Sequence, residues 1–152
     1  QADALRPAAS ARGLPQTLAV RTMHPGTPTA VEVVREFWRL MATNDFASVG
    51  AVLAEQYILD WPQSNERIRG KENFAALNAV YPSHGPWAFT VHRIVGNETE
   101  AASEVSVSDG VQNAKAISFF TVVGGRITSQ VEYRPEPYPA PINRRQFVEQ
   151  LP

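Results

Sequence analysis

Two hydrophobic periods divide the chain beyond residue 28. From residue 29 to residue 81, apolar side chains recur every three or four positions, which is the spacing of one helix face. Three segments follow this spacing and are predicted as helices: TPTAVEVVREFWRLMATND, FASVGAVLAEQ and GKENFAALNAVYP. Thr29 and Glu32 have the spacing of a capping box at the start of the first segment. Between the second and third segments lies YILDW, a short apolar run that Pro62 ends, which predicts a strand.

After Pro86 the hydrophobic period changes to two, which is typical of strands with one buried face. Four segments show this alternation: WAFTVHRIV, TEAASEVSVS, AKAISFFTVV and RITSQVEYR. The links between them, GNE, DGVQN and GG, are too short for crossovers, so neighbouring strands should be antiparallel. Helices cannot lie between such strands and must cover one face of a curved sheet. The pattern therefore predicts an α+β fold.

The composition is that of one domain with an extension at each end. At 152 residues, the chain can bury a core without disulfides. Residues 1–28 are rich in Ala, Pro, Arg and Thr and lack sustained periodicity, so we expect an N-terminal arm that docks on a second subunit. Met23 is a candidate start within this arm. Residues 29–152 form the predicted single domain, which ends in a Pro-rich tail with a short helical pattern.

Charge and cysteine content exclude several classes of function. The formal net charge is −1, which gives no electrostatic reason for a nucleic-acid or membrane partner. The chain has no cysteine, which removes disulfides, thiolate catalysis and Cys-ligated metals. No two histidines have the spacing of metal ligands, so we predict no metal and no cofactor. No apolar run approaches the ~20 residues that cross a bilayer, and we expect a cytoplasmic protein.

Two stretches of the sequence resemble a known family. DWPQSNERIRGKENFAALNAVYP is similar to the strand, loop and helix around the cavity mouth of SnoaL-like proteins, a branch of the nuclear-transport-factor-2-like superfamily. VVGGRITSQVEYRPEPYPAPINRRQFVE is similar to the last hairpin and proline-rich tail of close members. The resemblance extends from about Val31 to Leu151. It leaves the chemistry open, because this fold supports isomerases, cyclases, hydrolases, dehydratases and binding subunits.

The resemblance implies a more specific architecture than the pattern alone. It implies a cone, in which three helices cover the concave face of a strongly curved, mainly antiparallel sheet. Between sheet and helices it implies a mostly apolar pocket for a small apolar organic ligand. It also implies a homodimer that packs through the outer face of the sheet, which would cover the face that the helices leave open.

Asp60 is the first candidate for a catalytic base, because it ends the apolar run YILDW. The resemblance places it where ketosteroid isomerase keeps its general base, and we expect its carboxylate at the cavity wall. The two oxyanion donors of that enzyme align roughly with Phe37 and Ile117, which cannot donate a hydrogen bond. Alternatively, Asp60 is structural and accepts hydrogen bonds from the loop NERIRG. Burial would raise its pKa, which suits a base, whereas an ion pair would lower it.

Glu104 and Glu132 are the other acidic candidates. Limonene epoxide hydrolase, another member of the superfamily, activates water with an acid–arginine–acid triad. Its last acid aligns with Glu132, and its other two positions align with Glu104 and Ser106, so the charge pattern is not reproduced. Strand alternation alone makes Glu132 a solvated residue. Glu104 is a pocket carboxylate with a raised pKa if its strand face is concave, and a surface or interface charge if that face is convex.

The remaining candidates are expected to contact the ligand. His92 is the only histidine inside a predicted strand, and a lone histidine there fits packing better than catalysis. The three tryptophans are predicted to form core and pocket wall. The candidate catalytic residues are therefore Asp60, Glu104 and Glu132, and the candidate ligand-binding residues are Phe37, Trp38, Trp61, Trp87, His92, Ser106 and Ile117.

Three functions remain open on the sequence. The first is a small-molecule-binding protein with proton-transfer chemistry of the isomerase, cyclase or lyase type, in which Asp60 is the base. The second is a non-catalytic ligand-binding or accessory protein on the same fold. The third is an epoxide-hydrolase-like enzyme with an altered acid set. The side chains that point into the pocket should distinguish them.

Overall fold

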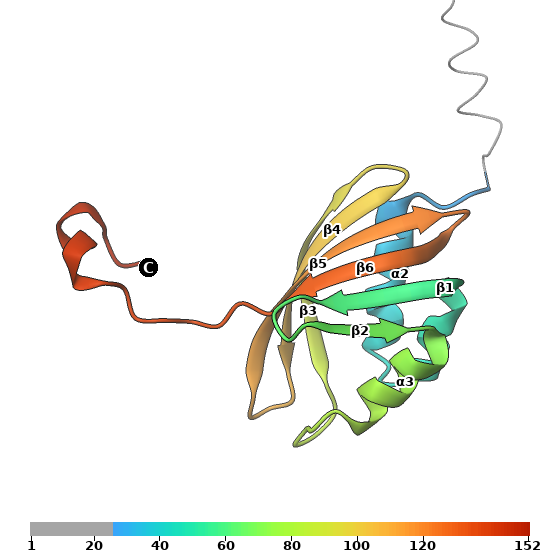
Figure 1. Cartoon of the computed structure of the whole chain (residues 1–152), viewed down its shortest axis with the longest axis horizontal. Helices are drawn as coiled ribbons and strands as arrows, with labels where there is room; N and C mark the ends of the chain where they lie inside the picture. The colour runs from blue at the N-terminus through green and yellow to red at the C-terminus, as the bar shows by residue number, and fades with distance from the viewer. Residues whose placement is uncertain (1–25) are drawn as a thin grey trace, which may run out of the picture.

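The computed structural model describes residues 26–152, which form a curved sheet, helices in its hollow and an extended C-terminal tail (Figure 1). The six strands lie in the order β2-β1-β6-β5-β4-β3. The helices are α2 (Ala30–Met41), η1 (Phe46–Val52), α3 (Lys71–Val80) and η2 (Ile142–Phe147). The strands are β1 (Leu53–Trp61), β2 (Glu66–Arg69), β3 (Ala88–Gly96), β4 (Glu100–Ser108), β5 (Asn113–Val123) and β6 (Arg126–Tyr133). The predicted N-terminal arm lies almost entirely outside the described residues.

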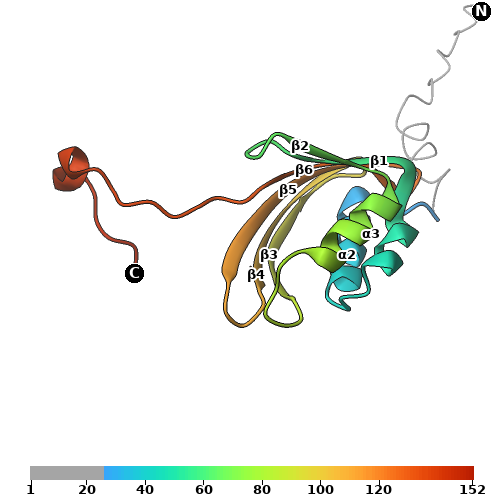
Figure 2. The same cartoon turned by 60° about the horizontal axis from the view of Figure 1, so that its bottom comes forward.

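Helix α2 lies on the concave side of the sheet (Figure 2). It begins where the sequence predicts, because the Thr29 hydroxyl oxygen accepts a hydrogen bond from the Glu32 backbone N–H at 3.2 Å. Its apolar face is buried and consists of Ala30, Val33, Val34, Phe37, Trp38 and Met41. The Phe37 ring packs edge-on against Phe120 of β5, with ring centroids 5.4 Å apart, so an aromatic contact joins this helix to the sheet.

The predicted four-strand meander is confirmed in extent and direction. Strands β3 to β6 pair as antiparallel neighbours. The β5–β6 link is a two-residue turn in which Gly124 (φ 59°) and Gly125 (φ 78°) both have positive φ. Glycine adopts this conformation without steric cost, which explains the Gly-Gly pair at this point.

A parallel pairing joins the two halves of the chain. Strand β1 runs parallel to β6, with Leu59 opposite Gln130 and Asp60 opposite Val131. On its other side, β1 pairs antiparallel with β2. The hydrophobic pattern did not predict β2, because its sequence ERIR contains a single apolar residue, Ile68. The sheet is therefore mainly antiparallel, as expected, with one parallel pair.

The second predicted helix is wrong in type and length. Residues 46–52 form a 3-10 helix, η1, and Leu53–Gln56, which the spacing assigned to the helix, belong to β1. Gly50 lowers the helix propensity of this segment, and a short helix gains little from propagation. Pairing with β6, where Leu53 lies opposite Ile127, satisfies the backbone instead. Two α-helices and one 3-10 helix thus cover the concave side.

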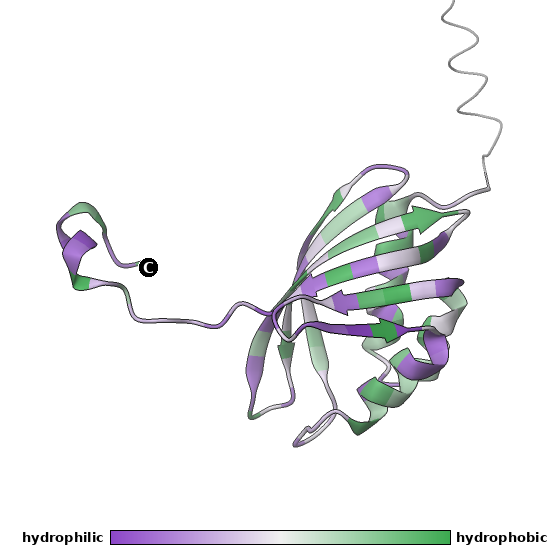
Figure 3. Cartoon of the chain, viewed as in Figure 1, coloured by the Kyte–Doolittle hydropathy of each residue, from purple (hydrophilic) through white to green (hydrophobic). Residues whose placement is uncertain are grey.

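Strand register assigns the sheet residues to two faces. Residues directly opposite each other in antiparallel strands share a face, so Ser103, Ser118 and Glu132 lie together across β4, β5 and β6. Trp38 of α2 donates from Nε1 to Ser103 Oγ at 3.0 Å, which identifies this face as the concave one. Alternate positions lie on the convex face, and Figure 3 shows the resulting alternation of hydrophobic and hydrophilic residues along the strands.

A buried carboxylate joins two loops at one end of the sheet. Asp109 follows β4, its side chain is fully buried, and it accepts hydrogen bonds from the backbone N–H groups of His84, Val111 and Gln112 at 2.7 to 2.9 Å. Burial alone would raise the pKa of Asp109, but these hydrogen bonds outweigh burial and hold the pKa well below its usual range. The ionised side chain therefore ties the α3–β3 loop to the β4–β5 hairpin.

The C-terminal tail leaves the sheet after Tyr133 and extends away from it in both views (Figures 1 and 2). The short helical pattern predicted for this tail is the 3-10 helix η2. Among residues 26–152, no helix combines the length and the apolar character needed to cross a bilayer.

Two matched valines test the assigned core. Val34 of α2 is fully buried, whereas Val80 of α3 is 75% exposed. Val34→Ala should reduce the free energy of unfolding by about 1–3 kcal/mol, because it removes buried methyl groups and leaves a cavity. Val80→Ala should change it by less than ~0.5 kcal/mol. Urea denaturation measures both, and equal effects would contradict the assignment.

Asp109→Asn should lower the free energy of unfolding at pH 7, because an amide places donor hydrogens among the donors that surround this side chain. A carboxyl whose folded pKa is depressed stabilises the fold above its unfolded pKa of about 3.9, and this stabilisation is lost as pH falls toward the folded pKa. The difference between wild type and variant should therefore be larger at pH 7 than at pH 3. Urea midpoints at the two pH values measure it, and a constant difference would contradict this account.

Candidate functional site

A cavity of about 470 Å³ lies between the concave face of the sheet and the helices. Its wall is largely aromatic and includes Phe37, Trp38, Trp61, Phe74, Trp87 and Phe89. An apolar wall with a few polar groups is typical of small-molecule sites. The volume suits an organic molecule of moderate size.

A second hollow of about 640 Å³ lies beside α3 and is more open to solvent. It shares Asn78, Tyr81 and Trp87 with the cavity, and the carboxylate among its lining residues is Asp45. The cavity is the more enclosed of the two and is the stronger candidate site, because it combines aromatic side chains with converging polar side chains.

Strand β6 supplies the polar side of the cavity. Gln130 and Glu132 of this strand, and Arg134 directly after it, all line the cavity. The sequence expectation of a solvated Glu132 is wrong, because Gln130 is only 1% exposed and Glu132 only 8%. The polar face of β6 points inward, toward the helices, and its alternate residues Val131 and Tyr133 point outward.

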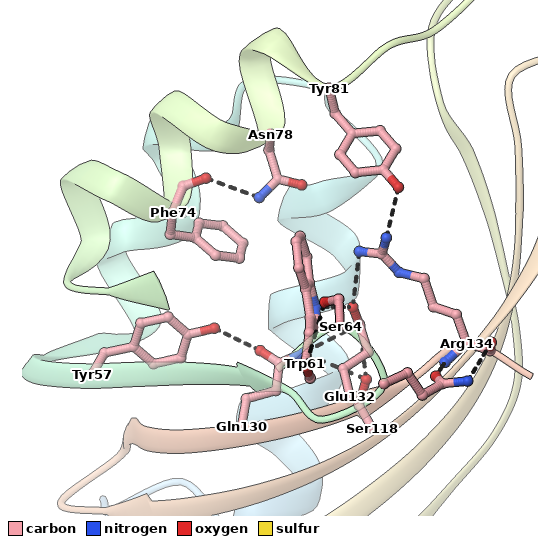
Figure 4. Close-up of polar contacts among 11 residues, drawn as sticks. Tyr57, Trp61, Ser64, Phe74, Asn78, Tyr81, Ser118, Gln130, Glu132 and Arg134 are labelled. Atoms are coloured by element: carbon pink, nitrogen blue, oxygen red, sulfur yellow. Dashed lines mark hydrogen bonds and ion pairs between the residues drawn. The ribbon is translucent and has the colours of Figure 1, made fainter. Parts of the chain in front are cut away.

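Two neutral donors and one guanidinium hold the Glu132 carboxylate (Figure 4). Trp61 Nε1 donates to Oε2 at 2.9 Å, and the Ser118 hydroxyl donates to Oε1 at 3.0 Å. The Arg134 guanidinium lies 3.4 Å from Oε2. The indole N–H can only donate, so this geometry suits a carboxylate that accepts on both oxygens.

Gln130 and Tyr57 extend this hydrogen-bonded group into the core. The Tyr57 hydroxyl donates to Gln130 Oε1 at 2.7 Å, and Gln130 Nε2 lies 3.4 Å from Ser118 Oγ. Burial raises the pKa of Tyr57 well above its usual value, and the nearby Glu132 charge raises it further. Tyr57 therefore remains a neutral donor, and the donors from Tyr57 to Ser118 are oriented toward Glu132.

Arg134 connects Glu132 to the cavity mouth. Its guanidinium carbon lies 4.1 Å from the ring centroid of Trp61 and 5.2 Å from that of Tyr81, so it contacts both aromatic faces. Its Nη1 donates to the Tyr81 hydroxyl oxygen at 2.8 Å (Figure 4). The Tyr81 oxygen accepts in this bond, which leaves its own O–H free to donate to a ligand in the cavity that it lines.

Asp60 does not lie at the expected cavity wall. Its neighbours Leu59 and Trp61 line the cavity, and Asp60 points to the opposite face because side chains alternate along a strand. Arg67 donates from Nε and Nη2 to the two carboxylate oxygens at 2.7 and 2.9 Å. These hydrogen bonds lower the pKa of Asp60, which is the direction expected for a structural ion pair.

Four other predicted site residues lie on the convex face rather than at the pocket: His92, Glu104, Ser106 and Ile117. Glu104 accepts hydrogen bonds from Lys115 Nζ at 2.8 Å and from Arg93 Nε at 2.7 Å, and these bonds lower its pKa. His92 Nε2 lies 2.6 Å from Ser106 Oγ. These four residues were named as pocket candidates from the sequence. They lie on the other face because a shift of one residue in a strand alignment moves each side chain of that strand to the opposite face.

The structure gathers five predicted residues around the cavity: Phe37, Trp38, Trp61, Trp87 and Glu132. Sequence reasoning missed Gln130, Arg134 and Tyr81 as members of the site. A signal existed for two of them, because Gln130 and Arg134 share the period of two with Glu132. Across the described part of the chain, no three His, Asp or Glu side chains are grouped closely enough to hold a metal ion.

Comparison with known proteins adds a family to this geometry. A family model described as a SnoaL-like domain matches residues 34–130, from α2 to the middle of β6. No curated protein matches the chain.

Several solved structures are similar to this one. A proposed ketosteroid isomerase from Kribbella flavida is 29% identical, covers 83% of this chain and 93% of its own, and has a TM-score of 0.75. An NTF-2-like protein of unknown function from Burkholderia xenovorans is 30% identical, covers 80% of this chain and 94% of its own, and has a TM-score of 0.66. An LEH-like epoxide hydrolase from M. tuberculosis is 24% identical, covers 70% and 82%, has a TM-score of 0.57, and is similar in fold alone. Because the family model matches more than half of the chain, this chain belongs to the SnoaL-like family.

Proposed function

We propose that this chain binds a small, mostly apolar organic molecule in the cavity and moves a proton on it, with Glu132 as the base. One observation carries the proposal: a carboxylate only 8% exposed lies in the wall of an aromatic cavity and is held there by side-chain donors. An acid or base in a water-poor pocket, oriented by fixed hydrogen bonds, is suited to proton transfer.

The polar groups fit the enolisation of a carbonyl compound. Glu132 takes a proton from the carbon next to the carbonyl, and the electron pair of that C–H bond forms a C=C bond. The carbonyl π electrons move to oxygen, which becomes an enolate oxyanion. The Tyr81 O–H, polarised by Arg134 at 2.8 Å, is the donor placed to stabilise this charge. Where the substrate also has a C=C bond between its β- and γ-carbons, the enolate is a conjugated dienolate. Glu132 then returns the proton to the γ-carbon, the C=O bond re-forms and the remaining C=C bond is conjugated with it, which completes an isomerisation with no other reactant.

Glu132 is a better base than Asp60 for two physical reasons. Asp60 lies on the face opposite the cavity and cannot reach a ligand there. One guanidinium, that of Arg67, also binds both of its oxygens at 2.7 and 2.9 Å, whereas the shorter contacts of Glu132 come from the neutral donors Trp61 and Ser118. The 29% identical relative described as a proposed ketosteroid isomerase supports the reaction class. It does not support the same residues, because the aligned positions Phe37 and Ile117 carry no donor.

A non-catalytic binding protein is the second candidate, and one observation favours it. Both Glu132 oxygens already accept hydrogen bonds, from Trp61 and Ser118, so this carboxylate can also serve only to hold the wall in place. An epoxide hydrolase with a second acid is less well supported. Glu104 and Ser106, which align with the other two triad positions, face away from the cavity.

Deuterium uptake tests the base without knowledge of the natural substrate. The protein is incubated in D₂O with a panel of enolisable ketones, from cyclohexanone to 2-decalone and a 3-ketosteroid, and mass spectrometry measures deuterium at the α-carbon. Wild type should accelerate uptake on at least one ketone. Glu132→Gln should lower this rate about 100-fold or more, because the amide cannot accept the proton. Tyr81→Phe should lower it by a smaller factor, about 10- to 100-fold, through the lost oxyanion donor.

Asp60→Asn is the matched control, since it also neutralises one strand carboxylate. It should leave deuterium uptake unchanged. Loss of uptake in Asp60→Asn but not in Glu132→Gln would restore Asp60 as the base. Saturable ketone binding by tryptophan fluorescence, with no uptake in wild type, would favour the non-catalytic candidate.

We also propose a homodimer that packs through the convex face of the sheet. This face exposes large apolar side chains, including Val95 (58% exposed), Phe119 (52%) and Tyr133 (40%). The ring centroids of Phe119 and Tyr133 lie 6.4 Å apart, so the two rings pack edge-on and offer one aromatic surface to a partner. A second copy is the expected cover, because a two-fold axis brings the same patch onto itself.

Phe119→Arg should weaken the dimer by about 100-fold or more, because a charge replaces an apolar contact on both copies at once. Light scattering across a dilution series measures the change. Val111→Arg is the control, since it places an arginine at a position 66% exposed in the β4–β5 hairpin, away from this patch. A concentration-independent monomer mass for the wild type would remove the proposal.

A further inference from the structure

The C-terminal tail, residues 135–152, carries apolar side chains that nothing in its own domain covers. Tyr138, Ile142, Phe147, Val148 and Leu151 are between 53% and 94% exposed. The backbone hydrogen bonds of η2 and its flanks, from Arg144 to Pro141 and from Val148 to Arg145, are internal to the tail. Both views show the tail leading away from the sheet (Figures 1 and 2).

Prolines restrict how this tail can bind. The segment PEPYPAP has proline at every second position, from Pro135 to Pro141. Proline fixes φ and holds the preceding residue extended, so the segment loses little freedom when it docks. Proline also lacks an N–H, which prevents regular strand addition at a sheet edge. The tail is therefore suited to dock by its side chains on a face.

The convex face offers a hollow for such side chains. A pocket of about 370 Å³ lies across β3 to β6, and its apolar lining includes Val95, Ala102, Phe119 and Val131. These residues occupy outward positions that share one face by register, since Ala102 lies opposite Phe119 and Phe119 opposite Val131. Each chain therefore carries uncovered apolar side chains in its tail. It also carries, on the convex face, a hollow in which such side chains can bind.

We propose that the tail of one chain docks on the convex face of a second copy, with η2 and Phe147 over this hollow. The inference rests on the dimer proposed above and refines its contact: the partner's tail covers the hollow at Val95 and Phe119, and the two sheets meet beside it at Tyr133. A chain's own hollow is poorly placed for its own tail. Strand β6 runs from the hollow at Val131 toward Tyr133, and the tail continues away from the sheet. In a two-fold dimer, the hollow of the partner instead lies in the direction of the tail, so the tail of each copy occupies the hollow of the other.

The tail is long enough for this exchange. The extended segment Pro135–Pro141 spans roughly 22 Å at ~3.1 Å per residue, and the six residues of η2 add roughly 12 Å at ~2.0 Å per residue, which makes roughly 34 Å together. A six-stranded sheet is about 24 Å wide at ~4.8 Å per strand. One tail can therefore cross the face of a partner sheet.

The exchange would also connect assembly to the cavity. Pro135, Glu136 and Pro137, at the root of the tail, line the cavity mouth. Docking of Phe147 on the partner fixes these residues, so the mouth of each cavity takes its final shape only in the dimer.

Photocrosslinking between isotope-labelled chains tests the inference. Phe147→benzoylphenylalanine is prepared in unlabelled and ¹⁵N-labelled protein, the two are unfolded and refolded together, and the sample is irradiated. Mass spectrometry should find crosslinks between a light and a heavy chain that map to β3–β6 residues of the hollow. The same probe at Val80, which is 75% exposed on α3, should give no such crosslinks. Light–light and heavy–heavy crosslinks alone, or no crosslinks to the sheet, would overturn the proposal.

A tail variant separates this inference from the sheet-to-sheet dimer. Ile142→Ser, Phe147→Ser and Leu151→Ser together should raise the dimer dissociation constant about tenfold or more, whereas Arg144→Ala with Arg145→Ala should not. If wild type is dimeric by light scattering and the serine variant is equally so, the tail contact is refuted and the sheet contact stands. Phe119 lines the hollow as well as the sheet patch, so Tyr133→Arg, outside the hollow lining, tests the sheet contact by itself. If Tyr133→Arg weakens the dimer and light–heavy crosslinks map to the hollow in wild type, both contacts hold. Deuterium uptake reports on catalysis independently of either result.

Discussion

The parallel pairing of β1 with β6 is the contact on which the site depends. It joins the helical first half of the chain to the last strand of the meander, and its register sets Leu59 opposite Gln130. That register brings Trp61 to hydrogen-bonding distance of Glu132. Parallel strands need a long connection, and here α3 and the four strands β2 to β5 supply it. Without this pairing the indole and the carboxylate would belong to separate parts of the molecule.

Glu132 can be buried because both of its carboxylate oxygens accept hydrogen bonds. A buried polar group costs free energy unless it is hydrogen-bonded. Among the described residues, every buried side-chain nitrogen and oxygen has a partner. The chain of donors from Tyr57 through Gln130 and Ser118 orients the polar wall before any ligand arrives. Such a preorganised group can stabilise charge with little rearrangement.

The two faces of the sheet differ in character. The concave face gathers the cavity, and the convex face carries the ion pairs of Asp60 and Glu104 with exposed basic side chains. Exposed ion pairs contribute little to stability, so they do not hold the fold together. Exposed apolar residues such as Phe119 lie on the same face.

The sequence by itself determined the elements whose signal is local. The capped first helix, the four alternating strands and the Gly-Gly turn each follow from spacing and backbone preference over a few residues. The resemblance of two stretches predicted the family and the cone. The tryptophans were placed correctly at the cavity because large aromatic side chains are buried wherever the core forms.

Only the tertiary structure decided which side of each strand faces the cavity. A period of two defines two faces but does not say which one the helices cover, and a one-residue error exchanges them. Asp60 and Glu104 therefore moved outward, and Glu132 moved inward with Gln130 and Arg134. Strand β2 and the start of β1 also escaped prediction, because their backbones are satisfied by partners distant in sequence rather than by local preference. Glu132 was a catalytic candidate that strand alternation alone would have left in solvent, and contacts between distant strands place it in the cavity.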